Sequence, residues 1–358
     1  LEDDETQCVA SACIPCDRGP LGVKVLNAGK HYFTDKSPFT TLEQLEDAKK
    51  AVAESGKRYM VYYSERLHNE SSMKATELIR DGAVGDVLQV INLAPHRMSK
   101  GARPDWFFEK DKYGGILTDI GSHQFEQFLA FTGATDGTVN FARVENFTAP
   151  EKPGLEDFGE CSLTLDTGAS CYCRIDWLTP DGLRVWGDGR AFVLGTEGTL
   201  EIRKYITVAR QEPANKIFLV NGEEETEIDC DGSTGYPFFG EMILDLLNGT
   251  EKAMTQDHIF KSAELSMLAT TNVSYGELQG LFDGLLGAII ALELAHSVHL
   301  MVTGKRGFAQ VRIVLIIGIL AVVRKLIVIE LEAVSGLLLF GLAAAIVALG
   351  GVYALLLW

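Results

Sequence analysis

The fold is decided by residues 31–63, which read HYFTDKSPFTTLEQLEDAKKAVAESGKRYMVYY. A strand-like run at His31–Thr34 and a buried-type strand at Arg58–Tyr63 flank a helical pattern over Thr41–Ser55. Gly56 follows that pattern at the position where glycine ends helices. Strands that are separated by helices of this length predict a parallel, doubly wound sheet.

The same alternation continues on both sides of this stretch. Upstream, we expect a short strand over Cys8–Ile14, a turn at Gly19-Pro20 and a helix over Leu21–Ala28. Downstream, a helix over Glu70–Asp81 is closed by Gly82. Residues 1–85 therefore form the parallel α/β part of the chain.

Beyond Gly85 the pattern changes to closely spaced strands with turns between them. We expect these strands over 87–93, 139–147, 159–165, 169–177, 191–194 and 199–203. Short turns such as Asp166-Thr167-Gly168 indicate hairpins, so the sheet should be mostly antiparallel and open on one face. Helices near 121–132 and 237–248 should cover its other face, and a helix near 257–269 should return to the first domain. Residues 86–270 thus form an α+β domain.

The composition changes abruptly after a linker at 271–280. Three long apolar segments follow, at Leu281–Thr303, Val311–Ile329 and Gly336–Trp358, and the last contains no charged residue. Segments of this kind are long enough to span a bilayer, so we expect a tail of three transmembrane helices over 281–358. Glu293, His296 and Arg324 would then be ionisable groups at membrane depth.

The charge is equally uneven. The chain carries a net charge of −17, whereas residues 281–358 carry +1, so residues 1–280 carry −18. This acidic body excludes the basic footprint of a nucleic-acid-binding protein. The seven cysteines are scattered and odd in number, which favours reduced thiols.

One stretch carries a candidate acid–base pair: Gly114-Gly115-Ile116-Leu117-Thr118-Asp119-Ile120-Gly121-Ser122-His123. On a continuous helix, Asp119 and His123 would lie one turn apart on one face. A carboxylate in that place orients an imidazole and tunes its charge, which suits proton transfer. A helix start with a chance acid/imidazole spacing remains the alternative at this point.

Residues 1 to about 270 resemble the Gfo/Idh/MocA oxidoreductases. Three pieces carry the resemblance: Gly29-Lys30-His31-Tyr32-Phe33-Thr34-Asp35-Lys36, the stretch from Gly114 to His123, and Gly187-Asp188-Gly189-Arg190 with Gly195-Thr196-Glu197-Gly198. The resemblance implies a partial Rossmann dinucleotide-binding domain over 1–85 and a substrate-binding, catalytic domain over 86–270. It also implies an NAD or NADP cofactor and a homo-oligomer formed through the open sheet face.

The resemblance further implies roles for particular residues. Lys36, Asp119 and His123 would be catalytic: Lys36 would hydrogen-bond the reacting oxygen, and His123 would take the hydroxyl proton. Asp119 would bind a substrate hydroxyl or orient His123. Pro15, Asp35 and Lys36 would contact the cofactor. The set expected to line a sugar or polyol pocket is His96, Arg103 and Trp106, and no metal is implied.

Two departures from the family pattern bear on these roles. Ser37 stands where the family has proline. The sequence also lacks a Gly-x-Gly-x-x-Gly motif after a first strand, so we expect it to enter the Rossmann pattern near its fourth strand. Without those backbone amides, cofactor affinity should be lower.

The tail resembles the PsiE-like, phosphate-starvation-inducible membrane proteins. The matching stretches are Ala291-Leu292-Glu293-Leu294-Ala295-His296 and residues 317–331. We expect the chain to join two unrelated pieces and to lie at a membrane, with the soluble part on the cytoplasmic side. Lys305, Arg306 and Arg312 flank the first loop between spans, and the positive-inside rule would place that loop, rather than residues 1–280, in the cytoplasm.

Two classes of function follow from the sequence. The first is an oxidoreductase that transfers a hydride between NAD(P) and a sugar, inositol or related polyol, with activity impaired by loss of the glycine-rich loop. The alternative is a membrane-anchored, non-catalytic or PsiE-like stress or transport protein that carries a vestigial dehydrogenase domain. In that case Glu293, His296 and Arg324 would form a polar network.

Overall fold

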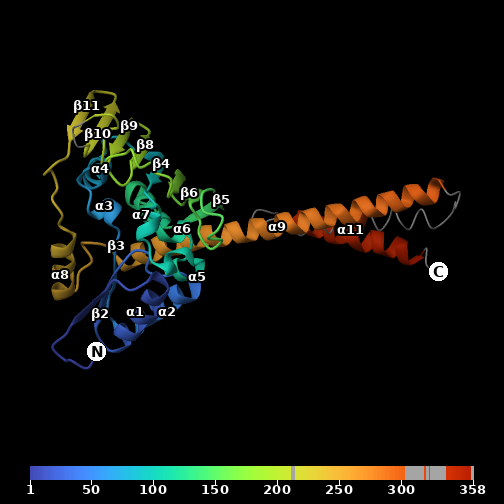
Figure 1. Cartoon of the computed structure of the whole chain (residues 1–358), viewed down its shortest axis with the longest axis horizontal. Coiled ribbons are helices and arrows are strands. Elements are labelled where there is room, and N and C mark those ends of the chain that lie inside the picture. The colour runs from blue at the N-terminus through green and yellow to red at the C-terminus, as the bar shows by residue number, and fades with distance from the viewer. Residues whose placement is uncertain (211–213, 303–317, 320–321, 323–335, 356–358) are drawn as a thin grey trace. The chain divides into compact units, whose positions relative to one another are not determined.

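A computed structural model describes residues 1–210, 214–302, 318–319, 322 and 336–355 of the chain (Figure 1). The chain divides into two compact units, Leu1–Val273 and Ser274–Trp358. Unit 1 contains two sheets and the helices around them, and unit 2 contains helices only in its described part.

The first sheet of unit 1 has three parallel strands in the order β1-β2-β3, as the sequence predicts. The strands are β1 (Cys8–Ser11), β2 (His31–Asp35) and β3 (Tyr59–Tyr62), with crossover helices α1 (Pro15–Asn27) and α2 (Leu42–Ser55). Thr41 caps α2, because its hydroxyl oxygen accepts a hydrogen bond from the Gln44 backbone N–H at 3.3 Å. Gly56 ends the helix in the left-handed conformation that the sequence predicts.

The predicted turn at Gly19-Pro20 is wrong, because both residues lie inside α1. A proline within a helix leaves the carbonyl four residues earlier without its usual N–H partner. Here that carbonyl belongs to Cys16, and it accepts a hydrogen bond from Gln44 Nε2 of α2 at 3.0 Å. A side chain from the neighbouring helix therefore compensates for the proline, which no local sequence pattern indicates.

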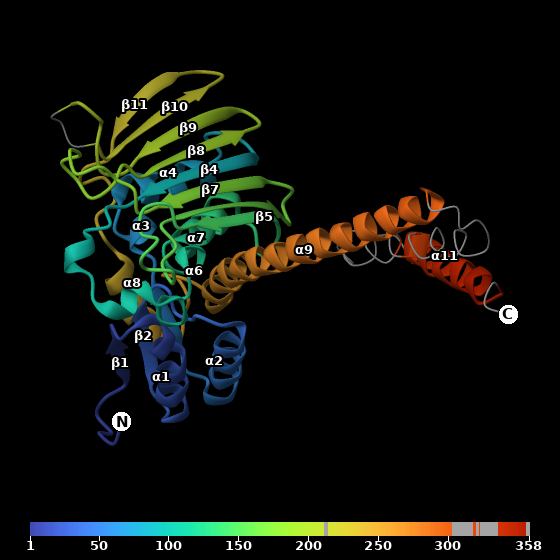
Figure 2. The same cartoon turned by 45° about the vertical axis from the view of Figure 1, so that its right-hand side comes forward.

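The second sheet has eight strands in the order β11-β10-β9-β8-β4-β7-β6-β5 (Figure 2). All neighbouring pairs are antiparallel except β4 and β7, so the expectation of a mostly antiparallel sheet is confirmed. The strands are β4 (Val87–Pro95), β5 (Gly137–Glu145), β6 (Phe158–Leu165), β7 (Ser170–Asp176), β8 (Arg190–Gly195), β9 (Gly198–Arg203), β10 (Lys216–Asn221) and β11 (Glu225–Asp229). The sequence analysis missed β10 and β11.

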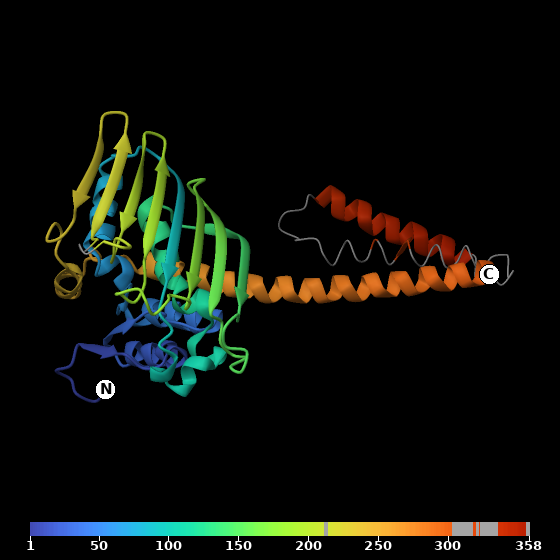
Figure 3. The ribbon, with the colours of Figure 1, turned by 45° about the horizontal axis from the view of Figure 1, so that its top comes forward.

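Helices cover one face of this sheet, and Figure 3 shows the strands lying in front of them. The covering helices are α4 (Glu70–Arg80), the short α6 (Ile116–Asp119) and α7 (Gly121–Thr132). Phe125, Phe128 and Leu129 of α7 join a buried core with the sheet residues that face them. α4 was expected in the first domain, yet Ala75 belongs to the core of the large sheet.

Helix α8 (Phe238–Asn248) was predicted to cover the large sheet, and this is wrong. Its Phe238 belongs to the core of the three-stranded sheet. The ring of Phe239 lies 5.7 Å from that of Phe33 and 4.7 Å from that of Tyr62, both residues of the small sheet. The aromatic pair at the start of α8 thus matches an aromatic surface that is formed only in the folded chain.

Helix α9 (Gln256–Val302) starts in unit 1, where Ile259 and Phe260 pack against the small sheet as predicted. It continues as a helix through 271–280, where the sequence suggested a linker, and α11 (Gly336–Leu355) follows in unit 2. Within the described parts of the chain, none of the helices combines the length and apolar character that crossing a bilayer requires. Most of the predicted span Val311–Ile329, and the side chains of Glu293, His296 and Arg324, lie outside the described residues.

Candidate active site

Lys36 is held at the carboxyl end of β2 by a buried arginine. Arg18 of α1 is 7% exposed, and its Nε donates to the Cys13 carbonyl at 2.8 Å. Its Nη1 donates to the carbonyls of Asp35 at 3.3 Å, of Lys36, and of Ser37 at 3.2 Å. The guanidinium group thus joins the ends of β1 and β2 and fixes the backbone that presents Lys36. The Lys36–Ser37 peptide bond is cis, although Ser37 replaces the family's proline.

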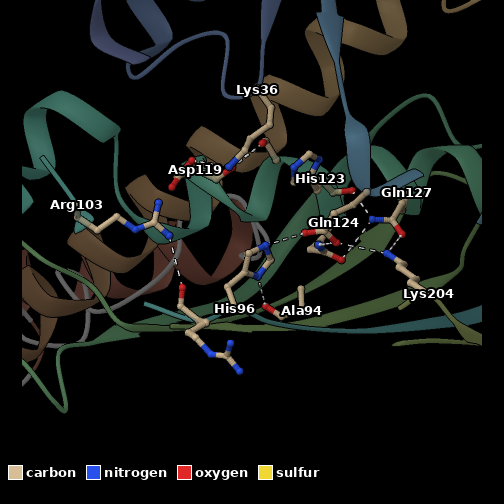
Figure 4. A network of polar contacts seen from close by, with 12 residues as sticks. Lys36, Ala94, His96, Arg103, Asp119, His123, Gln124, Gln127 and Lys204 are labelled. Carbon is tan, nitrogen blue, oxygen red and sulfur yellow. Dashed lines mark hydrogen bonds and ion pairs between the residues drawn. The ribbon is translucent and has the colours of Figure 1, made fainter. Parts of the chain in front are cut away.

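The side chain of Lys36 pairs with Asp119 at the end of α6. Its Nζ lies 2.6 Å from Asp119 Oδ1 and 3.2 Å from the Asp119 carbonyl oxygen (Figure 4). Both side chains are largely buried, at 18% and 13% exposed. A charge-assisted contact of this length holds the ammonium group in place.

His123 lies in the first turn of α7 and is 3% exposed. The expected continuous helix from Gly115 is interrupted at Ile120, which ends α6 and precedes α7. Among the described residues, Asp119 bonds Lys36 rather than His123. Burial lowers the pKa of His123 to about 3, although Glu65 opposes this shift. The imidazole is accordingly neutral near pH 7 and able to accept a proton. Its Nδ1 is buried and has no hydrogen-bond partner among the residues that the structure describes.

Glu65 lies beside His123, on the short α3 (Ser64–Leu67), and is 3% exposed. Its Oε2 accepts a hydrogen bond from Gln124 Nε2 at 2.9 Å and lies 3.4 Å from Lys204 Nζ. Lys204 also donates to Gln127 Oε1 at 2.6 Å. Burial raises the pKa of Glu65, but the attraction of Lys204 and of the neighbouring histidines outweighs it and lowers the pKa to about 2. The carboxylate is therefore charged and acts on His123 as a fixed negative group.

His96 follows β4 and contributes to the same group of side chains. Its Nε2 lies 3.4 Å from Glu65 Oε1, and its Nδ1 lies 3.0 Å from the Ala94 carbonyl oxygen. The ring centroid is 5.4 Å from that of Trp177 and 4.4 Å from that of Trp186. Burial lowers the pKa of His96 as well, so a second neutral imidazole lies near His123.

The remaining predicted residues lie in different parts of unit 1. Arg103 lies over the rings of Phe107 and Trp177, and Asp119 acts on it electrostatically, which connects it to the site. Trp106 packs against the core of the large sheet and has Phe107 as its aromatic neighbour. Pro15 begins α1, and Asp35 ends β2, so both lie at the carboxyl ends of adjacent parallel strands.

Several residues of the site were missed by the sequence analysis. They are Arg18, Glu65, Gln124, Gln127, Trp177, Trp186 and Lys204. The sequence could have indicated Gln124 and Gln127, because polar side chains are unusual on the side of a helix that packs against a sheet. Glu65 and Lys204 are 139 residues apart in sequence and meet only through the fold.

Comparison with known proteins identifies the family of this arrangement. Residues 72–201 match the GFO/IDH/MocA C-terminal domain. A crystal structure of a "putative oxidoreductase" from Erwinia carotovora atroseptica SCRI1043 is 48% identical, with a TM-score of 0.73, over 75% of this chain and 80% of that chain. The chain belongs to the GFO/IDH/MocA family.

Curated relatives and other solved structures are also similar to this chain. The scyllo-inositol 2-dehydrogenase (NAD(+)) of Bacillus subtilis is 27% identical over 56% of this chain and 56% of its own length. The chain spans about half the length of this curated relative. Levoglucosan dehydrogenase in complex with NADH has the same fold, with 15% identity and a TM-score of 0.65 over 76% of this chain and 79% of that chain. Residues 255–358 match a second family, the phosphate-starvation-inducible E family, so two families meet in one chain.

The residues of this GFO/IDH/MocA chain fit one end of a dinucleotide. Pro15, Asp35 and Lys36 lie at the carboxyl edge of a parallel sheet, which is the edge where open α/β sheets bind such ligands. The Nδ1 of His123 and the hydroxyl of Tyr63 are buried next to that edge, and in the described part of the chain neither has a hydrogen-bond partner. Their ring centroids are 6.2 Å apart. These residues would hold the nicotinamide end. Among the described residues, no group of three or more acidic, histidine or cysteine side chains could hold a metal ion.

Proposed function

We propose that this chain is an oxidoreductase that transfers a hydride between NAD(P) and a sugar, inositol or related polyol. The observation that carries the proposal is the position of a neutral, buried imidazole, His123, beside the Lys36–Asp119 ion pair. Relatives that are named as inositol and sugar dehydrogenases, which include a D-xylose dehydrogenase, support the substrate class.

Each residue has a defined task in this proposal. His123 accepts the proton of the substrate hydroxyl on an imidazole nitrogen, and the nearby Glu65 carboxylate stabilises the imidazolium that results. Lys36 donates a hydrogen bond to the same oxygen, whose negative charge grows as the C–H bond breaks. Asp119 holds the Lys36 ammonium group in place. When bound, NAD(P) supplies the hydride acceptor.

The proposal is tested with the purified full chain. NAD(P)H fluorescence should change on titration with protein, and absorbance at the nicotinamide band should report turnover of an inositol and sugar panel. His123→Asn should lower kcat by about 100-fold or more, because general acid–base catalysis contributes on that scale. His68→Asn is the matched control, since His68 is exposed and contacts the Tyr62 hydroxyl, at 2.7 Å, and the Tyr236 ring. Equal turnover by both variants would exclude His123 as the base.

We further propose that residues 281–358 attach the chain to a membrane, with the soluble part on the cytoplasmic side. The match to the phosphate-starvation-inducible E family and the apolar composition of the segment support this. Fractionation of cells that express the full chain tests it. Recovery of the full chain in the supernatant after ultracentrifugation would contradict it.

A further inference from the structure

Arg103 lies against two aromatic rings at the edge of the candidate active site. It lies between the short helices η1 (Lys100–Ala102) and η2 (Asp105–Phe108). Its guanidinium carbon is 4.5 Å from the ring centroid of Phe107 and 4.7 Å from that of Trp177. The two ring centroids lie 5.2 Å apart with an interplanar angle of 72°, so the guanidinium group sits in the corner that the rings form. Contact with both rings holds the guanidinium group in place, and its fork of N–H donors matches a planar, two-oxygen partner.

The same guanidinium group has no acidic partner of its own in the described part of the chain. Its Nε donates to the Met98 carbonyl at 2.9 Å, and its Nη2 lies 3.5 Å from the Arg97 carbonyl. Asp119 attracts it electrostatically, but that carboxylate is paired with Lys36. Arg66 is different, since it is bonded to both carboxylate oxygens of Glu126. Arg18 uses its donors on four backbone carbonyls. Arg103 therefore has a donor group that is left for a ligand.

Arg103 is the charged group of the site that has no opposite charge paired with it in the described part of the chain. Lys36 pairs with Asp119, and Lys204 pairs with Glu65. His96 and His123 are neutral near pH 7 because burial lowers the pKa of each. A partly buried cation without a counter-ion is costly, and a ligand anion that pairs with it recovers that cost.

An aromatic surface lies next to these polar groups. Trp186 is 40% exposed, and its ring centroid lies 4.4 Å from that of His96 and 4.6 Å from that of Tyr205. A flat, exposed indole beside polar side chains suits a ligand with an apolar ring face and a polar rim. A sugar ring has that character. Figure 4 shows the Arg103 guanidinium group turned toward Asp119 and His96, on the side where such a ligand would meet both.

We propose that Arg103 binds the carboxylate of a sugar acid, so that the substrate of this site is an acidic rather than a neutral sugar. The inference rests on the proposed function for the identity of the site, and it adds the charge of the substrate. The carboxylate pairs with the guanidinium group, the ring lies against Trp186, and the reacting hydroxyl faces His123.

The test compares two sugars of the same ring size, D-glucuronate and D-glucose, by calorimetric titration of the full chain without cofactor. D-glucuronate should bind about 10- to 100-fold more tightly than D-glucose, the range expected for charge-assisted hydrogen bonds. Arg103→Gln should remove this preference. Arg103→Lys should keep a part of it, because charge is retained while the planar, two-point contact is lost. The control is Arg143→Gln on β5, where the arginine pairs with Glu145 and Glu160.

Three results would overturn the proposal: equal affinity for both sugars, no binding of D-glucuronate, or an unchanged preference in a folded Arg103→Gln variant. If that variant does not fold, Arg103→Lys decides, because a preference identical to that of the unchanged chain is incompatible with two-point recognition. Turnover is measured separately. Arg103-dependent binding without hydride transfer to NAD(P) would exclude the proposed function and leave the sugar-acid site in place. Turnover of neutral sugars alone would support the proposed function and exclude the sugar-acid site.

Discussion

The Nζ of Lys36 lies 2.6 Å from Oδ1 of Asp119, and this ion pair joins the end of β2 to the end of α6. The two residues belong to different layers of unit 1, so the pair connects the parallel sheet to the helices that cover the large sheet. Because the side chains are largely but not fully buried, the pair contributes position more than stability.

Asp119→Asn should therefore affect catalysis more than folding. The amide keeps the shape but removes the charge that holds the Lys36 ammonium group, so kcat/KM should fall by about 10- to 100-fold. The free energy of unfolding should fall by only about 1 kcal/mol, as for partly exposed ion pairs. Steady-state kinetics and urea unfolding measure the two effects. Glu77→Gln, which removes an exposed partner of Lys74, is the control and should change neither.

Arg18→Met should lower folding stability more than Asp119→Asn does. Its guanidinium group is buried and donates to four backbone carbonyls, which lose these partners together. We expect the free energy of unfolding to fall by about 2–4 kcal/mol, since each buried group left without a partner costs about 1–3 kcal/mol and water recovers part of it. Urea unfolding measures this loss, and Arg80→Met at an exposed position should leave it unchanged. A loss below about 0.5 kcal/mol would show that Arg18 does not brace the Lys36 turn.

The alternation of strands and helices in residues 31–63 was predictable because it depends on local periodicity and on caps such as Thr41 and Gly56. Lys36, Asp119 and His123 were found by the order of three motifs, which resemblance supplies. The partner of Asp119 was not predictable, because spacing along a helix favours His123, and Lys36 is 83 residues away. Glu65 and Arg18 carry no motif, since their roles depend on carbonyls and side chains that only the folded chain brings together.

Close packing between α1 and the small sheet gives a prediction about Gly22. A Cβ atom at this helical position would lie 2.3 Å from Tyr59 Cε2 and 2.9 Å from Tyr32 Cδ1, and both tyrosines are fully buried. Gly22→Ala should therefore lower the free energy of unfolding by about 1–3 kcal/mol, the cost of overpacking a core. Gly240→Ala in α8 is the matched control, because a Cβ atom there meets nothing within 4 Å. It should raise the free energy of unfolding by about 0.5–1 kcal/mol through helix propensity. Chemical denaturation measures both changes in the free energy of unfolding, which should have opposite signs.

A part of the chain's sensitivity to acid should come from His123. Its pKa is lowered from 6.5 to about 3 in the folded chain, chiefly by burial, so between these pH values the unfolded chain binds a proton that the folded chain does not. Folding stability contributed by this residue is fully present above pH 6.5 and is lost as pH falls from 6.5 toward 3. His123→Gln, which has no such proton equilibrium, should flatten the dependence of unfolding free energy on pH between 6.5 and 5. Glu65 and Glu126, whose pKa values are lowered to about 2, contribute only below about pH 4.5, so they leave this window unaffected. Burial also lowers the pKa of His31 and of His96 below 6.5, so these two residues keep a part of the pH dependence in the variant. Urea midpoints that fall equally with acidification in both proteins would show that His123 does not contribute to this pH dependence.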